Sequence, residues 1–68
     1  MNIYTEIDER QKREALEILE KLLNNESVKR WDVLQRRFLI RGIMDKTDKY
    51  NEVDHELNLI IDMAKESL

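Results

Sequence analysis

The chain contains no proline and only one glycine, Gly42, in 68 residues. These two residues most often interrupt helices and shape turns, so their scarcity favours long helices. No stretch longer than four residues alternates apolar and polar side chains with β-branched enrichment, which is the pattern of a strand. The sequence therefore predicts an all-α fold.

Three segments repeat apolar residues at helical spacing, and they predict helices over about 5–23, 28–44 and 49–67. The connections between them are about four residues long, which places consecutive helices antiparallel. We therefore expect an antiparallel three-helix bundle that forms a single helical domain over residues 1–68.

Residues at the ends of these segments are typical of helix termini. Thr5 and Ser27 are expected to cap the first and second helices, and either Thr47 or Asp48 the third. Asn24 and Asn25 are expected to end the first helix, because Asn tolerates the left-handed backbone conformation.

The second segment is apolar on two sides, with Trp31 and Phe38 on one arc and Val33 and Ile40 on the other. A lone three-helix bundle has limited room to cover both arcs, so we expect a homodimer or higher oligomer. The residues predicted at the contact are Val33, Ile40, Met44, Leu59 and Met63. The residues predicted to form the core of each chain are Leu19, Leu22, Phe38, Leu57 and Ile61.

The residue types present argue against catalysis. There is no cysteine, which excludes a disulfide framework, a thiolate zinc site and a cysteine nucleophile. The only histidine, His55, follows Glu52 in a single Glu-x-x-His spacing and is expected on a solvated face. No glycine-rich phosphate loop is present. We therefore expect a protein that is not an enzyme and that holds neither a metal ion nor a cofactor.

Charge is distributed unevenly along the chain, although the net charge is only -3. The second segment contains one acid, Asp32, and five bases, which are Lys29, Arg30, Arg36, Arg37 and Arg41. Arg30, Arg37 and Arg41 have offsets of 7 and 4, so on one continuous helix they form a stripe. The stripe could bind an acidic protein or phosphates, or it could pair with the acidic segments on either side.

Trp31 lies beside this stripe, and tryptophan and arginine are enriched at binding hot spots. A core position for Trp31 is the other interpretation. We expect a binding module for another protein, acting as a regulator, adaptor or inhibitor of the kind that phages or mobile elements encode. Its predicted contact residues are Arg30, Trp31, Arg37 and Arg41. The alternative is a nucleic-acid-binding regulator that uses the same basic segment.

No uninterrupted apolar run is longer than the three residues of Phe38–Ile40, far short of the roughly 20 residues that span a membrane. A secretory signal has a basic stretch followed by an apolar stretch. The first six residues contain an acid, Glu6, and no such pattern follows the start of the chain. The sequence therefore predicts a cytoplasmic protein without a membrane partner.

Overall fold

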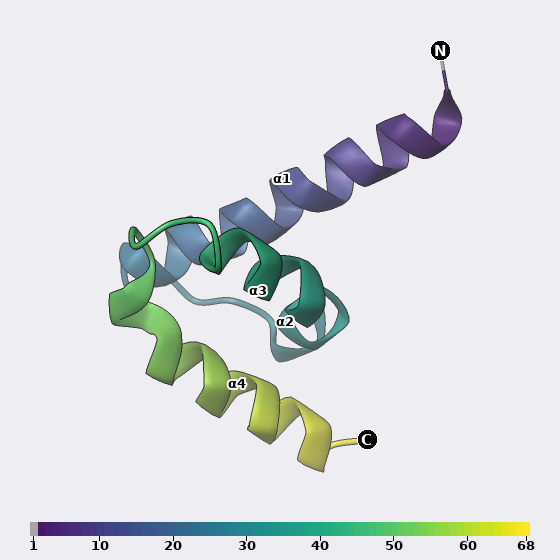
Figure 1. Ribbon diagram of the computed structural model, residues 1–68. Helices are drawn as coiled ribbons and strands as arrows, with labels where there is room; N and C mark the ends of the chain where they lie inside the picture. Colours follow the sequence, from purple (N-terminus) through teal and green to yellow (C-terminus); the bar gives the residue numbers. More distant parts are fainter. Residues whose placement is uncertain (1) are drawn as a thin grey trace.

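The structure is a computed structural model that describes residues 2–68, and within that range it is helical without any strand. The α-helices are α1 (Ile3–Leu23), α2 (Arg30–Gln35), α3 (Arg37–Met44) and α4 (Asp54–Glu66), as Figure 1 shows. A short 3₁₀ helix, η1 (Asn51–Val53), leads directly into α4. The predicted all-α class is confirmed, but the described part of the chain has four α-helices where three were expected.

Helix α1 begins two residues earlier than predicted, and its cap is Asn2 rather than Thr5. The side-chain oxygen of Asn2 accepts a hydrogen bond from the backbone amide of Tyr4 at 2.9 Å. This bond satisfies one of the amides that a helix leaves unpaired at its start. Thr5 therefore lies inside the first turn.

The end of α1 follows the prediction. Asn25 has φ of 58°, in the left-handed region. The amide of Glu26 donates to the Lys21 carbonyl at 2.9 Å, and the amide of Asn25 donates to the Leu22 carbonyl at 3.2 Å. Together these bonds close the helix in a Schellman motif. Ser27 is not the cap of the next helix, because α2 starts at Arg30 without a side-chain capping bond.

The predicted helix over 28–44 is wrong, since the chain breaks at Arg36 into α2 and α3. Arg36 has φ of -104° and ψ of 11°, outside the geometry of a regular helix. Helix α2 buries Val33 and Leu34 and packs mainly on α4, whereas α3 buries Ile40 and packs on α1. The break lets the two short helices contribute Val33, Leu34 and Ile40 to one core, while Trp31 and Phe38 stay exposed.

The third predicted helix starts later than expected. Tyr50 is buried in the turn that precedes η1, and α4 begins only at Asp54. Within the turn the hydroxyl of Thr47 accepts a hydrogen bond from the amide of Lys49 at 3.2 Å. Thr47 thus stabilises the turn rather than the start of a helix.

One hydrophobic core joins the helices, and four of the five residues predicted for it are buried. These four are Leu19, Leu22, Leu57 and Ile61. The fifth prediction is wrong: Phe38 is 77% exposed, because the break at Arg36 turns Ile40 inward. The buried core comprises Ala15, Ile18, Leu19, Leu22, Val33, Leu34, Ile40, Met44, Tyr50, Val53, Leu57, Ile61 and Ala64.

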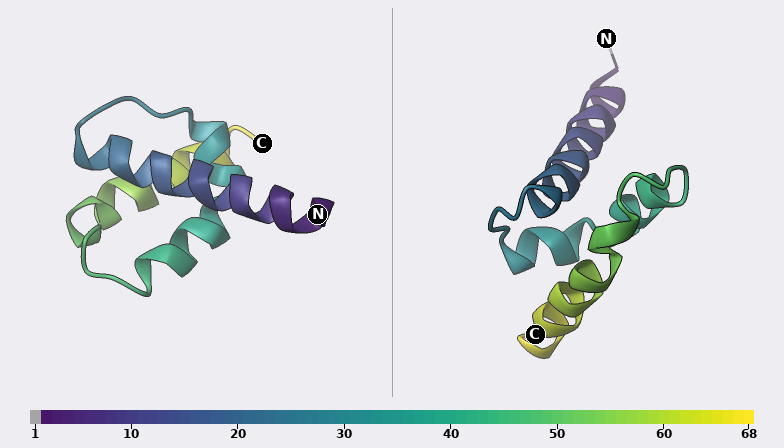
Figure 2. Two further views of the ribbon diagram at one scale, coloured as in Figure 1. Left: turned by 90° about the horizontal axis from the view of Figure 1, so that it is seen from above. Right: turned by 90° about the vertical axis from the view of Figure 1, so that its left-hand side faces the viewer.

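The helices do not form a parallel-sided bundle. Helices α1 and α4 lie close together at one end and diverge toward the other, with α2 and α3 between them, as Figures 1 and 2 show. At the closed end the Lys49 ammonium donates to Glu20 at 2.9 Å. The antiparallel three-helix arrangement is therefore not what the chain adopts.

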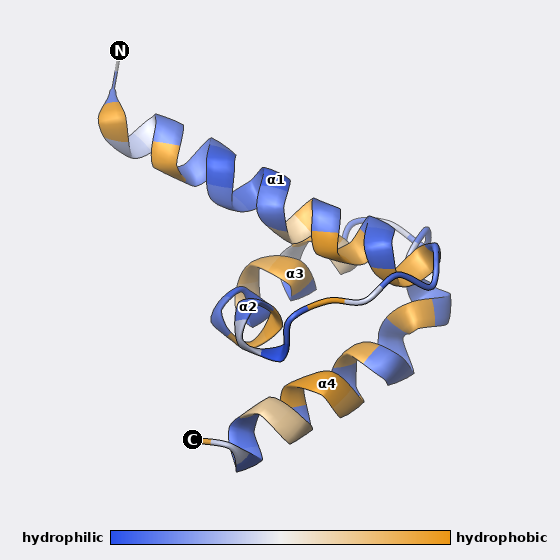
Figure 3. Cartoon of the chain, turned by 180° about the vertical axis from the view of Figure 1, so that it is seen from behind, coloured by the Kyte–Doolittle hydropathy of each residue, from blue (hydrophilic) through white to orange (hydrophobic). Residues whose placement is uncertain are grey.

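The N-terminal half of α1 extends beyond the rest of the molecule, as Figures 2 and 3 show. We call residues 3–13 the α1 arm. Every residue of the arm is exposed except Gln11, which is half-buried. Orange bands in Figure 3 mark apolar residues on the arm, where no other element packs against the helix.

Candidate protein-binding surface

The break at Arg36 divides the predicted basic stripe. Arg30 lies on α2, and Arg37 and Arg41 lie on α3, so an offset of 7 no longer places Arg30 on the face of Arg37. The stripe assumed one continuous helix with 3.6 residues per turn. The four residues predicted to bind a partner, which are Arg30, Trp31, Arg37 and Arg41, consequently do not form one row.

Arg41 is engaged by α4. Its guanidinium forms an ion pair and hydrogen bond with Asp54 and donates a second hydrogen bond to the side-chain oxygen of Asn58. About two thirds of its side chain is covered. Because a planar guanidinium can serve two acceptors at once, Arg41 ties the end of α3 to α4. It stabilises the fold and has little freedom to contact a partner.

Arg37 is engaged locally. Its Nη1 donates to the carbonyl of Leu34 at 2.6 Å, and its guanidinium lies 4.6 Å from the centre of the Phe38 ring. In a continuous helix the Leu34 carbonyl would accept from the Phe38 amide, and the break removes that donor. Arg37 therefore replaces a lost backbone bond and at the same time stacks on an exposed aromatic ring.

Arg36 is largely enclosed, with 16% of its side chain exposed. It pairs with Glu14 of α1 and, at 3.8 Å, with Asp32 of α2. Its Nε is buried and has no hydrogen-bond partner. The only local signal for this role is the four-residue offset between Asp32 and Arg36, because Glu14 belongs to a different helix.

The turn that starts α2 keeps its charges and its aromatic ring in solvent. Lys29 and Arg30 are exposed, and neither forms an ion pair with any of residues 2–68. Trp31 follows them and is 55% exposed, so the core position considered for it is wrong. We call Lys29, Arg30 and Trp31 the α2 turn surface. At this surface the predicted combination of an arginine and a tryptophan, Arg30 and Trp31, stays exposed to solvent and accessible to a partner.

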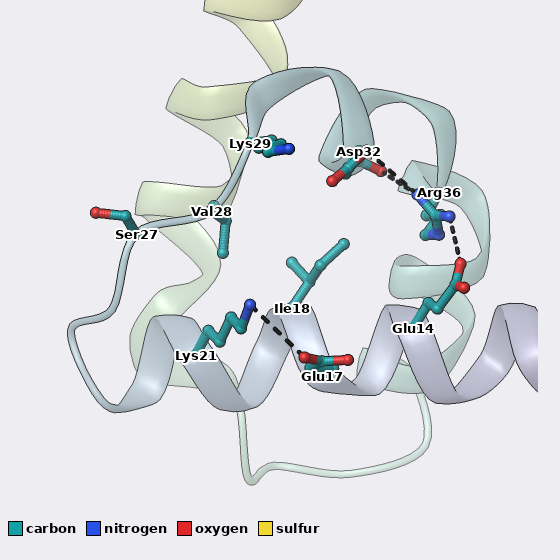
Figure 4. A pocket seen from close by; sticks show the side chains of 9 residues that line it. All are labelled: Glu14, Glu17, Ile18, Lys21, Ser27, Val28, Lys29, Asp32 and Arg36. Atoms are coloured by element: carbon teal, nitrogen blue, oxygen red, sulfur yellow. Dashed lines mark hydrogen bonds and ion pairs between the residues drawn. The ribbon is translucent and has the colours of Figure 1, made fainter.

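Two hollows flank the α2 turn surface. The larger, of about 570 Å³, lies between α1 and the start of α2 and is drawn in Figure 4. Ile18 and Val28 form its apolar part, and Lys29 stands at its edge (Figure 4). Glu17 and Lys21 pair at 3.6 Å on the α1 side, and Arg36 closes the far end.

The second hollow, of about 320 Å³, lies on the other side of the turn. Arg30 lines it together with Val28, Ile60 and Glu56. Each hollow combines an apolar floor with charged side chains at the rim. A partner side chain could insert on either side of the α2 turn and find both kinds of contact.

The residues predicted for self-association are divided between core and surface. Val33, Ile40 and Met44 are buried among the chain's own helices, which corrects their placement at a contact between copies. The arc that contains Val33 and Ile40 is therefore covered within one chain, whereas Trp31 and Phe38 of the other arc stay exposed. Leu59 and Met63 remain exposed on α4, away from its buried residues.

Titratable groups show one clear perturbation, at the closed end of the molecule. The hydrogen bond from Lys49 lowers the pKa of Glu20 below its ordinary value of 4.5. The same bond raises the pKa of Lys49 above 10.5. Neither group lies in a hollow, so the pair has the features of a surface ion pair rather than of an acid–base catalyst. His55 is exposed.

Among residues 2–68 no three side chains of the metal-binding types gather at one place. None of the helices in this range has both the length and the apolar character needed to cross a bilayer. Comparisons with protein-family models, curated proteins and solved structures give no match.

Proposed function

We propose that this protein is a non-enzymatic binding module that captures an acidic region of another protein through the α2 turn surface. The observation that carries the proposal is the half-exposed Trp31 beside Lys29 and Arg30, two cations without an ion pair in the described residues. Tryptophan and arginine are the residues most enriched at binding hot spots, and the hollows on either side supply apolar pockets. Such a module would act as a regulator, adaptor or inhibitor.

The way the basic residues are paired within the chain favours a protein partner over a nucleic acid. Arg36, Arg37 and Arg41 satisfy acids or a carbonyl of the same chain. That leaves two cations at the α2 turn, and the acids Glu26 and Glu56 line the neighbouring hollow. Nucleic-acid binding draws its affinity from many neutralised phosphates, and two cations beside carboxylates supply few of them.

The test is capture of a partner from the native cell with three forms of the protein. We expect the unmodified chain to retain a partner, and the double variant Arg30→Glu with Trp31→Ala to lose it. Truncating a hot-spot tryptophan costs at least about 2 kcal/mol of binding free energy. The matched control is Phe38→Ala, which removes another exposed aromatic ring from a different helix and should bind normally.

Circular dichroism melting must show that both variants keep the fold of the unmodified chain. Undiminished capture by the double variant, or equal loss in Phe38→Ala, would contradict the proposal. Tight DNA or RNA binding that weakens steeply as salt rises would favour the nucleic-acid alternative instead.

A further inference from the structure

The α1 arm has an apolar face that nothing in the described chain covers. Tyr4 and Ile7 each lie eleven residues, about three helical turns, before the core residues Ala15 and Ile18. The arm thus continues the core-facing side of α1 past the end of the core. Ile3 and Tyr4 are 65% and 75% exposed. Most of the stability of an amphipathic helix comes from burying such a face, which suggests that this one has a partner.

A second unpartnered apolar surface lies on α3, beside the base of the arm. It is a hollow of about 240 Å³, which we call the α3 hollow, lined by Lys12, Phe38, Leu39, Gly42, Ile43 and Lys46. Its floor is apolar, its two charged residues are both lysines, and no acid lines it. Lys12 pairs with Glu9 at 4.0 Å, but both side chains are more than half exposed. The charge at the rim of the hollow is therefore positive.

The charge of the arm complements that of the hollow. Residues 3–9 contain three acids, Glu6, Asp8 and Glu9, and no base. Their apolar residues are Ile3, Tyr4 and Ile7, which match an apolar floor. We propose that the occupant of the α3 hollow is the α1 arm of a second copy of this chain. Each copy inserts the tip of its arm, residues 3–9, into the lysine-rimmed hollow of the other copy. We call residues 3–9 the arm tip.

The order of charges along the arm supports a symmetric exchange. The acidic block of Glu6, Asp8 and Glu9 is followed at once by Arg10, Lys12 and Arg13. Two arms that run antiparallel about a two-fold axis near Glu9 and Arg10 set each acidic block against the other copy's basic block. The same register brings each arm tip beside the other copy's Lys12, at the rim of the α3 hollow. A two-fold contact of this kind uses the same surface on both copies and closes at the dimer.

The α1 arm and the α3 hollow do not include Lys29, Arg30 or Trp31. The exchange therefore goes beyond the proposed function and uses a different surface. It keeps the predicted self-association and moves the contact from residues of the core to side chains that the fold leaves exposed. Failure of one proposal does not decide the other.

The experiment uses two charge-reversed variants that cannot pair with themselves but can pair with each other. Variant A carries Glu6→Lys and Asp8→Lys, so its arm tip is basic. Variant B carries Lys12→Glu and Lys46→Glu, so the rim of its hollow is acidic. In a mixture both contacts are restored, because the basic arm meets the acidic hollow and the native arm meets the native hollow.

We expect sedimentation equilibrium from micromolar to millimolar concentration to show a dimer, twice 8.3 kDa, for the unmodified chain. Variants A and B should each sediment as monomers, and their equimolar mixture should form a dimer. The double variant Asp62→Lys with Glu66→Lys is the matched control, because it reverses two exposed acids of α4 that belong neither to the arm nor to the α3 hollow. It should dimerise like the unmodified chain.

Circular dichroism must show that the variants keep their helical content and melt cooperatively. A monomeric unmodified chain throughout the concentration range would overturn the proposal and leave the hollow to a different protein. Dimers of variant A or B alone would place the contact elsewhere. A mixture that stays monomeric would equally contradict the exchange of arms.

Discussion

The two halves of α1 both carry apolar residues at helical spacing, but they have different surroundings. In the C-terminal half Ala15, Ile18, Leu19 and Leu22 are buried against α3 and η1. In the N-terminal half the residues on the same side of the helix, such as Ile7, are exposed, and no other element packs against that half in Figure 3. Periodicity therefore tells which side of a helix is apolar, but the neighbours decide how much of that side becomes core.

The difference between the halves also appears in their ion pairs. In the arm, Lys12 pairs with Glu9 across one turn of the same helix. Farther along, Glu14 pairs with Arg36 at the helix break, and Glu20 pairs with Lys49 before η1. These two pairs join elements that are distant in sequence, so they contribute to tertiary structure, whereas the arm pair, like the Glu17–Lys21 pair, lies within one helix.

The largest expected effect comes from truncating equivalent apolar residues in the two halves. Leu19→Ala removes a side chain with no exposed surface, and we expect it to lower the free energy of unfolding by about 2–5 kcal/mol. Ile7→Ala on the arm should change it by no more than about 0.5 kcal/mol, as for an ordinary surface position. Urea denaturation of dilute protein, where dimers dissociate, measures both values.

Equal losses for the two variants would contradict the comparison, since they would mean that the arm is packed as tightly as the core. A loss at Ile7 that appears only at high protein concentration has a different cause. It would reflect binding of the folded chain to a second copy, which adds to apparent stability by mass action.

How far the fold could be predicted is clearest at the break in the second segment. The sequence correctly indicates helix throughout, because apolar spacing and the lack of proline are local properties. It does not reveal the break at Arg36, where neither proline nor glycine stands. The break is favoured by burying Val33 and Leu34 against α4 and Ile40 against α1, and those contacts exist only after the chain has folded.

The candidate site was predicted in part for the same reason. Trp31 and Arg30 are exposed, as a binding surface requires, although the sequence pattern was equally compatible with a core position for Trp31. Arg41 was assigned to a stripe that a broken helix cannot form. Its partners Asp54 and Asn58 lie 13 and 17 residues farther along, beyond the reach of local pattern analysis.

A smaller effect is expected at Gly42, on the side of α3 that faces the hollow beside the arm. A Cβ added at this position meets no atom within 4 Å. Gly42→Ala should therefore stabilise the monomer by about 0.5–1 kcal/mol, because alanine restricts the unfolded chain and favours helix. Thermal melting of dilute protein measures the gain. A destabilised variant would show that α3 depends on the freedom of glycine at this position.

The smallest expected effect concerns the ion pair that closes the C-terminal half of α1. The hydrogen bond from Lys49 lowers the pKa of Glu20 in the folded chain. Its stabilising contribution is therefore fully present above the ordinary pKa of 4.5 and is lost as the pH falls through the lowered value. The pKa of Lys49 is raised in the folded chain, so the stabilising contribution of its ammonium is fully present below pH 10.5. That contribution is lost as the pH rises through the raised value.

Glu20→Gln should accordingly melt slightly below the unmodified chain at neutral pH, and the difference should disappear in acid below the lowered pKa of Glu20. Both side chains are largely exposed, so the difference should also shrink as salt is added. Glu9→Gln is the matched control, because its pair with Lys12 lies within the arm and joins no second element. Melting curves of the unmodified chain and the two variants at neutral and acid pH measure the difference. If Glu9→Gln destabilises the fold as much as Glu20→Gln does, the arm contributes to tertiary stability, and the two halves of α1 do not differ in this respect.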